Sequence, residues 1–351
     1  MSMTLMECEA REVPQLIAQQ IAANAEVLLR LRKRLQATPP RYALTIGRGS
    51  SDHACTYAKY LLETNLGLIT ASAAPSVVTI YQAQLRMQDA LVIGVSQSGR
   101  SPDICRMMEV ARRDGAVTVA MVNDSNSPLA QIAEFLVPLY AGAERAVAAT
   151  KSYIASLTAL AQLTAVIADH QPLLDALPRL PATLAEVLQV NWEPAIQEFK
   201  DVQNTLVIAR GFGFPIAQEA ALKFKETSAI QAEAFSAAEI LHGPFVLIKK
   251  QHPYLLFAQT DETLPGIVAL AKKIASLGGR VILSLAQDAS VTAAELIKIA
   301  DLVLPMPKSL TAMLDPIMSI QAFYLMVAQL AVARGFNPDA PKNLSKITET
   351  F

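Results

Sequence analysis

The chain has 351 residues, of which 52 % are hydrophobic and 17 % are charged, and its formal net charge at pH 7 is −1. A chain of this length and composition can bury a substantial core, which argues against intrinsic disorder and predicts one large or two ordinary domains. The balanced charge and the lack of a long basic run argue against a nucleic-acid-binding protein.

The first half of the chain alternates between expected strands and helices. Apolar residues at helical spacing predict helices over residues 7–37, and an apolar run predicts a strand at Tyr42–Ile46, followed by a glycine-containing loop and a further helix. We expect further strands at Val77–Tyr81, Ala90–Val95, Val117–Val122 and Leu136–Leu139, and helices at Pro102–Arg113 and Ser152–Ala168. This alternation is typical of a parallel sheet with helices on both faces.

The same pattern recurs in the second half of the chain. Strands are expected at Thr205–Ala209, Tyr254–Ala258, Val281–Leu285 and Leu302–Leu304, and helices at Ile216–Glu226 and Leu264–Leu277. The segment IGRGSS at Ile46 matches IARGFG at Ile208, and ARRDGAVTVAMV matches IASLGGRVILSL at nearly the same separation along the chain. Two independent anchors at one separation indicate an internal duplication. We therefore predict an α/β fold of two tandem, doubly wound subdomains.

The three cysteines, Cys8, Cys55 and Cys105, share no CxxC spacing. Their odd number and irregular spacing indicate a reducing compartment and argue against disulfides or structural zinc. The first residues lack the basic-then-apolar pattern of a signal peptide, and the apolar runs that read as strands are far shorter than a membrane span. We therefore expect a soluble cytoplasmic protein that binds no membrane.

A group of polar residues follows the strand that ends near Val95. Ser96-Gln97-Ser98-Gly99 leads into a predicted helix, with Ser101 as its N-cap and Pro102 at its first position. Hydroxyl and backbone N–H groups at the positive end of a helix suit a phosphate dianion. Ser50 and Ser51 follow the preceding strand, where the crevice of an open parallel sheet is expected. The alternative is a capped turn that binds no ligand.

A second polar stretch runs from Leu222 to Pro244. Lys223 and Glu226 share one face if this stretch begins as a helix, and His242 precedes a Gly-Pro turn. A carboxylate, an ammonium and an imidazole together are typical of proton-transfer chemistry. A solvated helix face followed by a turn is the alternative interpretation.

The two halves differ in their loop chemistry. Where the first half has its serines, the second has Gln259-Thr260-Asp261-Glu262, whose carboxylates would repel phosphate. We therefore predict that the first half binds an anion and the second half supplies the proton-transfer groups. Gly47-Arg48-Gly49 is a weak match to a dinucleotide fingerprint because Asp52 takes the place of its third glycine.

These motifs resemble the sugar isomerase (SIS) family, and most closely the isomerase half of the glucosamine-6-phosphate synthases. The resemblance covers nearly the whole chain, and its most specific part is the stretch that ends in His242. The matching segments are Met6 to Pro14, GRGSSDHA, SQSGRSPD, Val147 to Lys151, ALKFKE, AEAF, AEILHGP and Asp339 to Lys346.

The resemblance implies a role for each candidate site residue. Substrate phosphate would be bound by Ser51, Ser96, Gln97, Ser98 and Ser101, with Ser50 beside them. Val147 would touch the sugar through its backbone. His242 would assist ring opening, Glu226 would move a proton between C1 and C2, and Lys223 would steady the charged intermediate. Lys346 would sit at the open-chain carbonyl, where it could form a Schiff base.

The resemblance also implies an overall organisation. Each subdomain would contain a parallel five-stranded sheet flanked by helices, and a homodimer would place His242 across the subunit interface. No metal or organic cofactor is expected. The implied divisions are N-terminal helices over 1–40, a phosphate-binding subdomain over 41–170, a linker over 171–193, a catalytic subdomain over 194–335, and a tail over 336–351 that closes the active site.

The chain departs from this family in ways that bear on its reaction. The isomerase pattern starts almost at residue 1, without the glutaminase domain of the synthases, and Leu241 and Ala238 replace a lysine and a glycine of the family. Without glutamine as an ammonia source, we expect deamination of glucosamine 6-phosphate to fructose 6-phosphate. The alternatives are a deaminase or deglycase of galactosamine 6-phosphate or fructosamine 6-phosphate, or a non-catalytic sugar-phosphate sensor.

Overall fold

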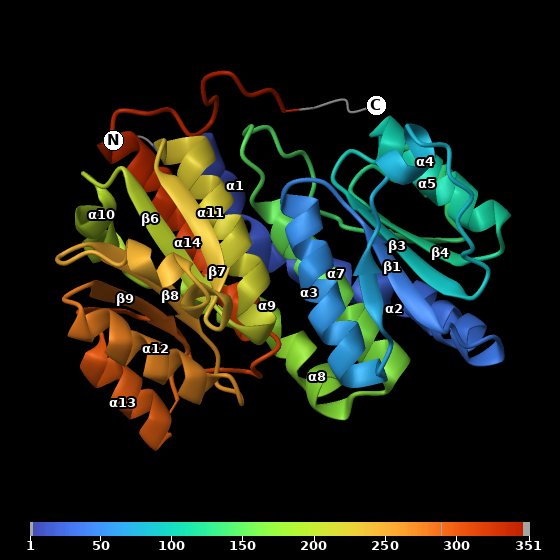
Figure 1. Cartoon of the computed structure of the whole chain (residues 1–351). Helices are drawn as coiled ribbons and strands as arrows, with labels where there is room; N and C mark the ends of the chain where they lie inside the picture. The colour runs from blue at the N-terminus through green and yellow to red at the C-terminus, as the bar shows by residue number, and fades with distance from the viewer. Residues whose placement is uncertain (1–2, 289, 347–351) are drawn as a thin grey trace. The chain divides into compact units, whose positions relative to one another are not determined.

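The computed structural model describes residues 3–288 and 290–346, and it divides into two compact units (Figure 1). The β1–β5 unit consists of Val13–Glu144, Lys151–Pro178 and the tail from Ser345. The β6–β10 unit consists of the chain through Glu12 together with Arg145–Thr150 and Arg179–Leu344. The last five residues of the predicted C-terminal tail lie outside the described residues.

The β1–β5 unit contains a five-stranded parallel sheet, as predicted. Its strands are β1 (Tyr42–Ile46), β2 (Thr70–Ser72), β3 (Ala90–Ser96), β4 (Val117–Val122) and β5 (Phe135–Pro138), in the spatial order β2-β1-β3-β4-β5. Its helices are α2 (Val13–Ala37), α3 (Ser50–Leu66), α4 (Ser76–Thr79), α5 (Pro102–Arg113), α6 (Pro128–Ile132), α7 (Lys151–Ala168) and α8 (Gln171–Ala176). Every residue of β3 and β4 is buried, which explains their continuous apolar runs.

The β6–β10 unit repeats this plan. Its strands are β6 (Asn204–Ala209), β7 (Gln231–Ser236), β8 (Pro253–Ala258), β9 (Arg280–Leu285) and β10 (Leu302–Leu304), in the order β7-β6-β8-β9-β10. Its α-helices are α1 (Leu5–Arg11), α9 (Leu180–Val187), α10 (Glu193–Phe199), α11 (Phe214–Ser228), α12 (Leu264–Ser276), α13 (Val291–Ile299) and α14 (Asp315–Ala333). Its short 3-10 helices are η2 (Gly211–Gly213), η3 (Glu239–Leu241) and η4 (Pro244–Leu247), and η1 (Leu177–Arg179) spans the boundary between the two units in the chain. The matching strand orders support the internal duplication.

The predicted strand at Val77–Tyr81 is wrong. These residues carry the β-branched run that favours strands, but Ser76–Thr79 forms the short helix α4, which starts after Pro75 in a helical conformation. The second strand of the sheet is instead Thr70–Ser72, which pairs with β1. A three-residue edge strand leaves too short an alternation in the sequence to be recognised.

Two described helices, α7 and α14, are long and apolar enough in composition to cross a membrane. In the structure, 89 % and 83 % of their most apolar windows are buried within the fold. The core helices of globular units have the same length and composition, so their hydrophobicity is explained by packing. α14 packs against α11, and α7 packs against α2 and α3 (Figure 1).

Two carboxylates tie distant segments together within the β6–β10 unit. Glu9 is 2 % exposed, and its two carboxylate oxygens accept hydrogen bonds from the backbone N–H groups of Arg145 and Ala146. The carboxylate of Asp339 accepts from the N–H groups of residues 5 and 6 at the start of α1. A carboxylate at this position satisfies N–H groups that have no partner within the helix and complements its dipole.

Candidate active site

Both loops that carry the predicted phosphate-binding residues lie at the same edge of the first sheet. The loop before α3 follows β1, and the SQSG loop follows β3, the neighbouring strand. The order β2-β1-β3-β4-β5 changes direction between β1 and β3. In open parallel sheets, ligands bind beyond the carboxyl ends of the strands at such a switch point. The fold therefore brings Ser50 and Ser51 to the same crevice as Ser96, Gln97, Ser98 and Ser101.

An ion pair joins the two loops. Arg48 follows β1, and its Nε and Nη2 donate to Oδ2 of Asp103 at 3.0 and 2.6 Å. The Asp103 side chain is 2 % exposed, and its other oxygen accepts from the N–H of Ile104 at 2.8 Å. Because Asp103 is in the first turn of α5, this contact fixes the start of the helix against the β1 loop.

The SQSG segment is ordered by its own hydrogen bonds. Ser96 is buried at the end of β3, and its Oγ accepts from the N–H of Gly99 at 3.0 Å. Ser98 Oγ accepts from the N–H of Arg100 at 3.3 Å. Ser101 occupies the predicted N-cap position of α5, with Pro102 following, but the Ser101 side chain makes no capping hydrogen bond. Helix capping therefore does not account for a serine at this position.

Gly99 permits the tight turn between β3 and α5. Its φ is +63°, and a Cβ atom built there would lie 2.2 Å from Oγ of the buried Ser127. Both the backbone conformation and the close approach therefore require a residue without a side chain.

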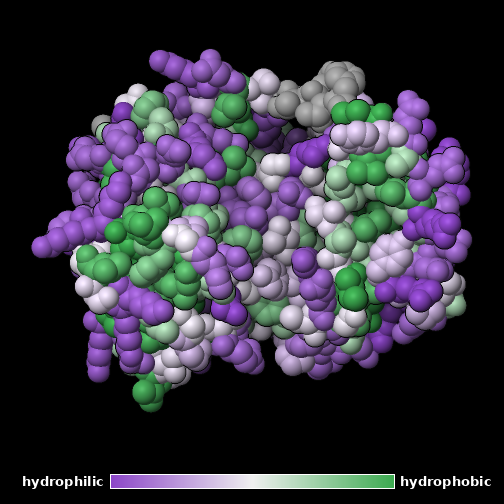
Figure 2. Space-filling model, viewed as in Figure 1, coloured by the Kyte–Doolittle hydropathy of each residue, from purple (hydrophilic) through white to green (hydrophobic). Residues whose placement is uncertain are grey.

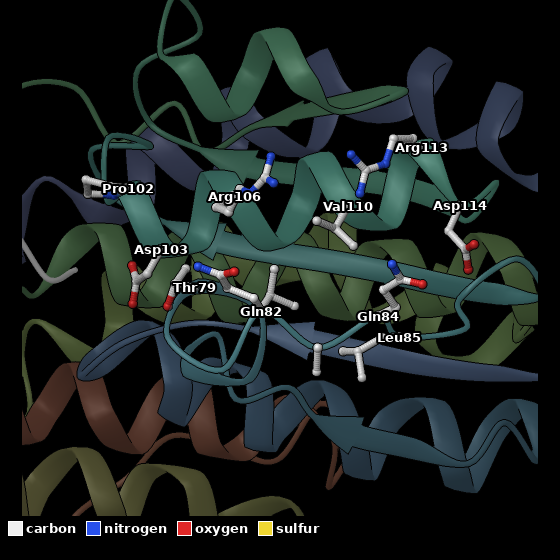
Figure 3. Close-up of a pocket in the computed structure, with 12 residues that line it drawn as sticks. Thr79, Gln82, Gln84, Leu85, Pro102, Asp103, Arg106, Val110, Arg113 and Asp114 are labelled. Atoms are coloured by element: carbon white, nitrogen blue, oxygen red, sulfur yellow. The ribbon is translucent and has the colours of Figure 1, made fainter.

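A groove of about 890 Å³ runs along one side of α5 (Figure 3). The helix contributes Arg106, Val110 and Arg113, and the segment between β2 and β3 contributes Thr79, Gln82, Gln84 and Leu85 to its walls. The groove begins at Pro102 and Asp103 in the first turn of α5. None of the predicted phosphate-binding residues lines this groove, so it is distinct from the switch-point crevice. It adjoins the crevice and runs along the flank of α5.

The β6–β10 unit contains a buried cluster of charged side chains on α11. Lys223 is fully buried, and its Nζ lies 2.5 Å from Oε2 of Glu226 and 3.3 Å from Oε1 of Glu219. The Glu219 side chain is 0 % exposed, whereas the Glu226 side chain is 23 % exposed. The predicted sharing of one helix face by Lys223 and Glu226 is confirmed. Glu226 is the member of this cluster that reaches the surface.

The lysine of this cluster stays charged. Burial alone lowers the pKa of Lys223, but the neighbouring charges of Glu219 and Glu226, together with their hydrogen bonds, raise the pKa above its usual value. A buried ammonium is stable only when it is paired in this way. Lys223 therefore presents a fixed positive charge to the Glu226 carboxylate.

His242 lies in a turn of the same unit. It ends η3, before Gly243 and Pro244 as predicted, and its side chain is exposed. Within the described residues, its imidazole makes no hydrogen bond or ion pair. The turn also exposes the apolar side chains of Leu241, Val246 and Leu247, by 43 %, 85 % and 45 %.

The two remaining predicted residues belong to different units. Lys346 is in the β1–β5 unit, where its Nζ lies 2.9 Å from Oε2 of Glu144. Ser152 holds the buried Glu144 carboxylate through hydrogen bonds from its N–H and its Oγ. Val147 is in the β6–β10 unit, and its N–H donates to the carbonyl of Asp339 at 3.0 Å.

Three residues connected to the predicted ones, Glu219, Tyr324 and Glu144, were not predicted from the sequence. Glu219 is four residues before Lys223, so the helical spacing of Glu219, Lys223 and Glu226 could have revealed it. Tyr324 donates its hydroxyl to Glu219 from a distant part of the chain, and Glu144 meets Lys346 across 202 residues. Neither of these two contacts leaves a local pattern in the sequence.

Two of the cysteines, Cys55 and Cys105, do not supply a reactive thiolate. Burial raises the pKa of both the Cys55 and the Cys105 thiols, so both remain protonated near neutral pH. Among residues 3–288 and 290–346, no three His, Cys, Asp or Glu side chains are grouped as a metal ion would require.

Comparison with known proteins identifies the family. The SIS domain family matches residues 39–166 and 198–333, which correspond to the two sheet-containing segments. The chain belongs to the SIS domain family. The two matched segments agree with the duplicated topology, and the resemblance drawn from the sequence motifs is confirmed.

Relatives of this SIS protein are sugar-phosphate enzymes. A glutamine–fructose-6-phosphate aminotransferase (isomerizing) from Thermococcus kodakarensis is 30 % identical over 96 % of this chain and 56 % of its own length. The chain thus spans about half the length of the curated relatives it matches. These similarities support a phosphosugar isomerase.

Two solved structures have the same fold. A candidate phosphosugar isomerase from Silicibacter pomeroyi DSS-3 superposes with a TM-score of 0.88 and is 38 % identical, covering 96 % of this chain and 100 % of its own. The C-terminal domain of the glucosamine-fructose-6-phosphate aminotransferase from Francisella tularensis superposes with a TM-score of 0.84 at 25 % identity, covering 96 % and 98 %.

We predict that Gly99→Ala destabilises the SIS protein because it strains the backbone and forces a Cβ atom onto Ser127. The matched control is Gly142→Ala, since Gly142 has φ +65° but no atom within 4 Å of the added Cβ. Urea denaturation should show a loss of about 1 kcal/mol for Gly142→Ala and about 2 to 4 kcal/mol for Gly99→Ala. Equal losses would contradict the close packing inferred at Gly99.

Proposed function

We propose that this SIS protein interconverts aldose and ketose forms of an amino sugar phosphate, and that its reaction is the deamination of glucosamine 6-phosphate to fructose 6-phosphate and ammonia. The observation that carries the proposal is the Glu219–Lys223–Glu226 cluster, in which a buried ammonium holds a partly exposed carboxylate. Burying an ion cluster is costly, and the exposed member of such a cluster is a candidate for proton transfer.

The first chemical step is ring opening and isomerisation. In this proposal, His242 assists ring opening of the pyranose, which exposes the C1 carbonyl of the open-chain aldose. Glu226 then takes the proton from C2 and returns it to C1, because a single carboxylate can serve as base and then as acid. The fixed charge of Lys223 holds Glu226 in place and favours the negative intermediate between the two proton transfers. Lys346 would engage the carbonyl, steadied by Glu144.

The second step is hydrolysis. As the double bond moves from the C1 carbonyl to C2, a proton passes from the C2 amine of glucosamine 6-phosphate to the C1 oxygen. The amine thereby becomes an imine and C1 becomes a hydroxymethyl group. Water adds to that imine carbon, the carbon–nitrogen bond breaks, and ammonia leaves, so that fructose 6-phosphate remains. The balanced reaction consumes one water and requires no oxidant or reductant. The same proton transfer would serve galactosamine 6-phosphate, and the reverse transfer, from C1 to C2, would serve fructosamine 6-phosphate, whose C1 imine water would then hydrolyse to an aldose phosphate. These two stay the alternative substrates.

Phosphate binding is assigned to the β1–β5 unit. The switch-point crevice, which includes the start of α5, offers hydroxyl, amide and backbone N–H donors for a dianion. These donors belong to Ser51, Ser96, Gln97, Ser98 and Ser101. The relatives named for fructose 6-phosphate support a six-carbon sugar phosphate as the ligand. Val147 would add a backbone contact to the sugar.

A homodimer completes this proposal. The His242 imidazole is exposed and is flanked by the exposed apolar side chains of Leu241, Val246 and Leu247. Figure 2 shows hydrophobic surface on the visible side of the β6–β10 unit. A turn that places apolar groups around an imidazole is suited to an interface, so we assign His242 to ring opening in a partner subunit.

A non-catalytic sensor is the second candidate function. It would bind the sugar phosphate through the serines of the β1–β5 unit alone. A sensor has no need for a partly exposed carboxylate backed by a buried ammonium, so the cluster on α11 favours the enzyme.

A substrate panel tests the reaction. The purified chain is incubated with glucosamine 6-phosphate, galactosamine 6-phosphate and fructosamine 6-phosphate, and free ammonia, ketose phosphate and aldose phosphate are measured. We expect ammonia and fructose 6-phosphate in equal amounts from glucosamine 6-phosphate. Turnover of only another amino sugar phosphate would correct the substrate, and binding without turnover of any of them would favour the sensor.

Glu226→Gln should retain binding of the sugar phosphate but lower kcat by about 10³-fold, because the amide cannot carry the proton. Exchange of the substrate C2 hydrogen with deuterated water gives a second readout, which should fall in parallel. The matched control is Glu186→Gln, an exposed residue of α9, which should behave as wild type. Wild-type turnover in Glu226→Gln would remove Glu226 as the base.

Ser98→Ala should raise KM by about tenfold with little change in kcat, because the lost hydroxyl contacts a charged phosphate that does not react. Ser276→Ala on α12 removes an exposed hydroxyl elsewhere and provides the control. A KM unaffected by Ser98→Ala would argue against phosphate binding at the SQSG loop.

A further inference from the structure

Tyr324 on α14 contacts the charged cluster of α11. Its side chain is fully buried, and its hydroxyl donates to Oε1 of Glu219 at 2.9 Å. The same Glu219 oxygen lies 3.3 Å from Lys223 Nζ. A phenol hydroxyl, a carboxylate, an ammonium and the Glu226 carboxylate therefore form one continuous chain of polar contacts inside the β6–β10 unit.

The lysine in this chain is shared unequally between two carboxylates. Nζ of Lys223 lies closer to Glu226 than to Glu219, at 2.5 against 3.3 Å. In a buried site, a carboxylate that loses a hydrogen-bond donor draws more strongly on its remaining partners. By donating to Glu219, the Tyr324 hydroxyl supplies part of the stabilisation that this carboxylate would otherwise draw from Lys223. The lysine is therefore directed mainly toward Glu226.

We propose that Tyr324 is a positioning residue for proton transfer, acting through Glu219 and Lys223 to set the strength of the ion pair that holds Glu226. This proposal rests on the proposed function, in which Glu226 carries the proton. Tyr324 does not touch the substrate. It determines how much of the Lys223 charge is directed at the reacting carboxylate.

Other charged groups on the elements around α11 have separate partners. Arg334, at the end of α14, donates from Nε to the carbonyl of Ser228. Asp315, at the start of α14, accepts from Ser309 and Thr260. Glu233 on the neighbouring strand β7 is exposed. The contact of Tyr324 with Glu219 joins a titratable group of α14 to the cluster.

Tyr324→Phe tests this role because it removes the hydroxyl and keeps the ring. We expect Lys223 to move toward Glu219, which weakens its pairing with Glu226. With glucosamine 6-phosphate as substrate, kcat should fall roughly tenfold while KM stays unchanged. The acidic limb of the pH profile of kcat should move upward by about one pH unit, because a less well paired carboxylate is protonated more readily.

Two comparisons separate this effect from a loss of packing. Tyr42, at the start of β1, donates its hydroxyl to the carbonyl of Arg86. Tyr42→Phe removes this hydroxyl and should leave the pH profile unchanged. If Tyr324 acts through Glu219, the Tyr324→Phe change should add no further shift of the acidic limb in a Glu219→Gln background. An unchanged or downward-shifted limb in Tyr324→Phe, or a full additional shift in the double variant, would overturn the proposal.

A measurement without substrate keeps this inference distinct from the proposed function. The ¹⁵Nζ signal of Lys223 is followed in the ligand-free, ¹⁵N-lysine-labelled chain and is assigned by its loss in Lys223→Arg. We expect Tyr324→Phe to shift this signal and Tyr42→Phe to leave it in place, even if none of the amino sugar phosphates is turned over. An unmoved Lys223 signal in a folded Tyr324→Phe variant would refute the positioning role by itself.

Discussion

The buried ammonium of Lys223 is the constraint on which the proposed chemistry depends. It carries a full positive charge at a site with no solvent exposure, so it must be matched by negative charge nearby. The helical spacing of α11 supplies Glu219 four residues before it and Glu226 three residues after it. Because Glu219 is fully buried, the negative charge that this cluster presents to solvent is concentrated on Glu226.

The duplicated sheets carry different polar side chains at corresponding loops. In the β1–β5 unit, the loop at the switch point ends in hydroxyl groups before α5. In the β6–β10 unit, Asp261 of the corresponding loop accepts from Thr263, and Thr260 donates to the buried Asp315. Burial raises the pKa of Asp315 to about 7. In this loop the hydroxyls donate to carboxylates, and the buried charged cluster of the second copy lies on α11.

The fold could be read from the sequence wherever a strand was buried on both faces or a helix was long. β3, β4 and β8 appear as continuous apolar runs because parallel central strands contact helices on either side. Short edge strands left weaker signals. β7, with the sequence QAEAFS, has few residues that favour strands, and it is a strand because its residues pair in register with β6. The run at Val77 had strand propensity but no neighbouring strand to pair with.

The sequence alone determined which chemical groups are present and how nearby residues are spaced: the SQSG loop before Pro102, the i, i+3 pair of Lys223 and Glu226, and the Gly-Pro turn after His242. The spacing of residues that are close together in the chain follows from chain connectivity, so these features can be recognised without knowledge of the fold. Only the tertiary structure decided that Arg48 ties the β1 loop to Asp103, that Glu144 receives Lys346, and that Tyr324 supports Glu219. Those contacts join residues far apart in the chain, and packing of strands and helices is what brings them within hydrogen-bonding distance.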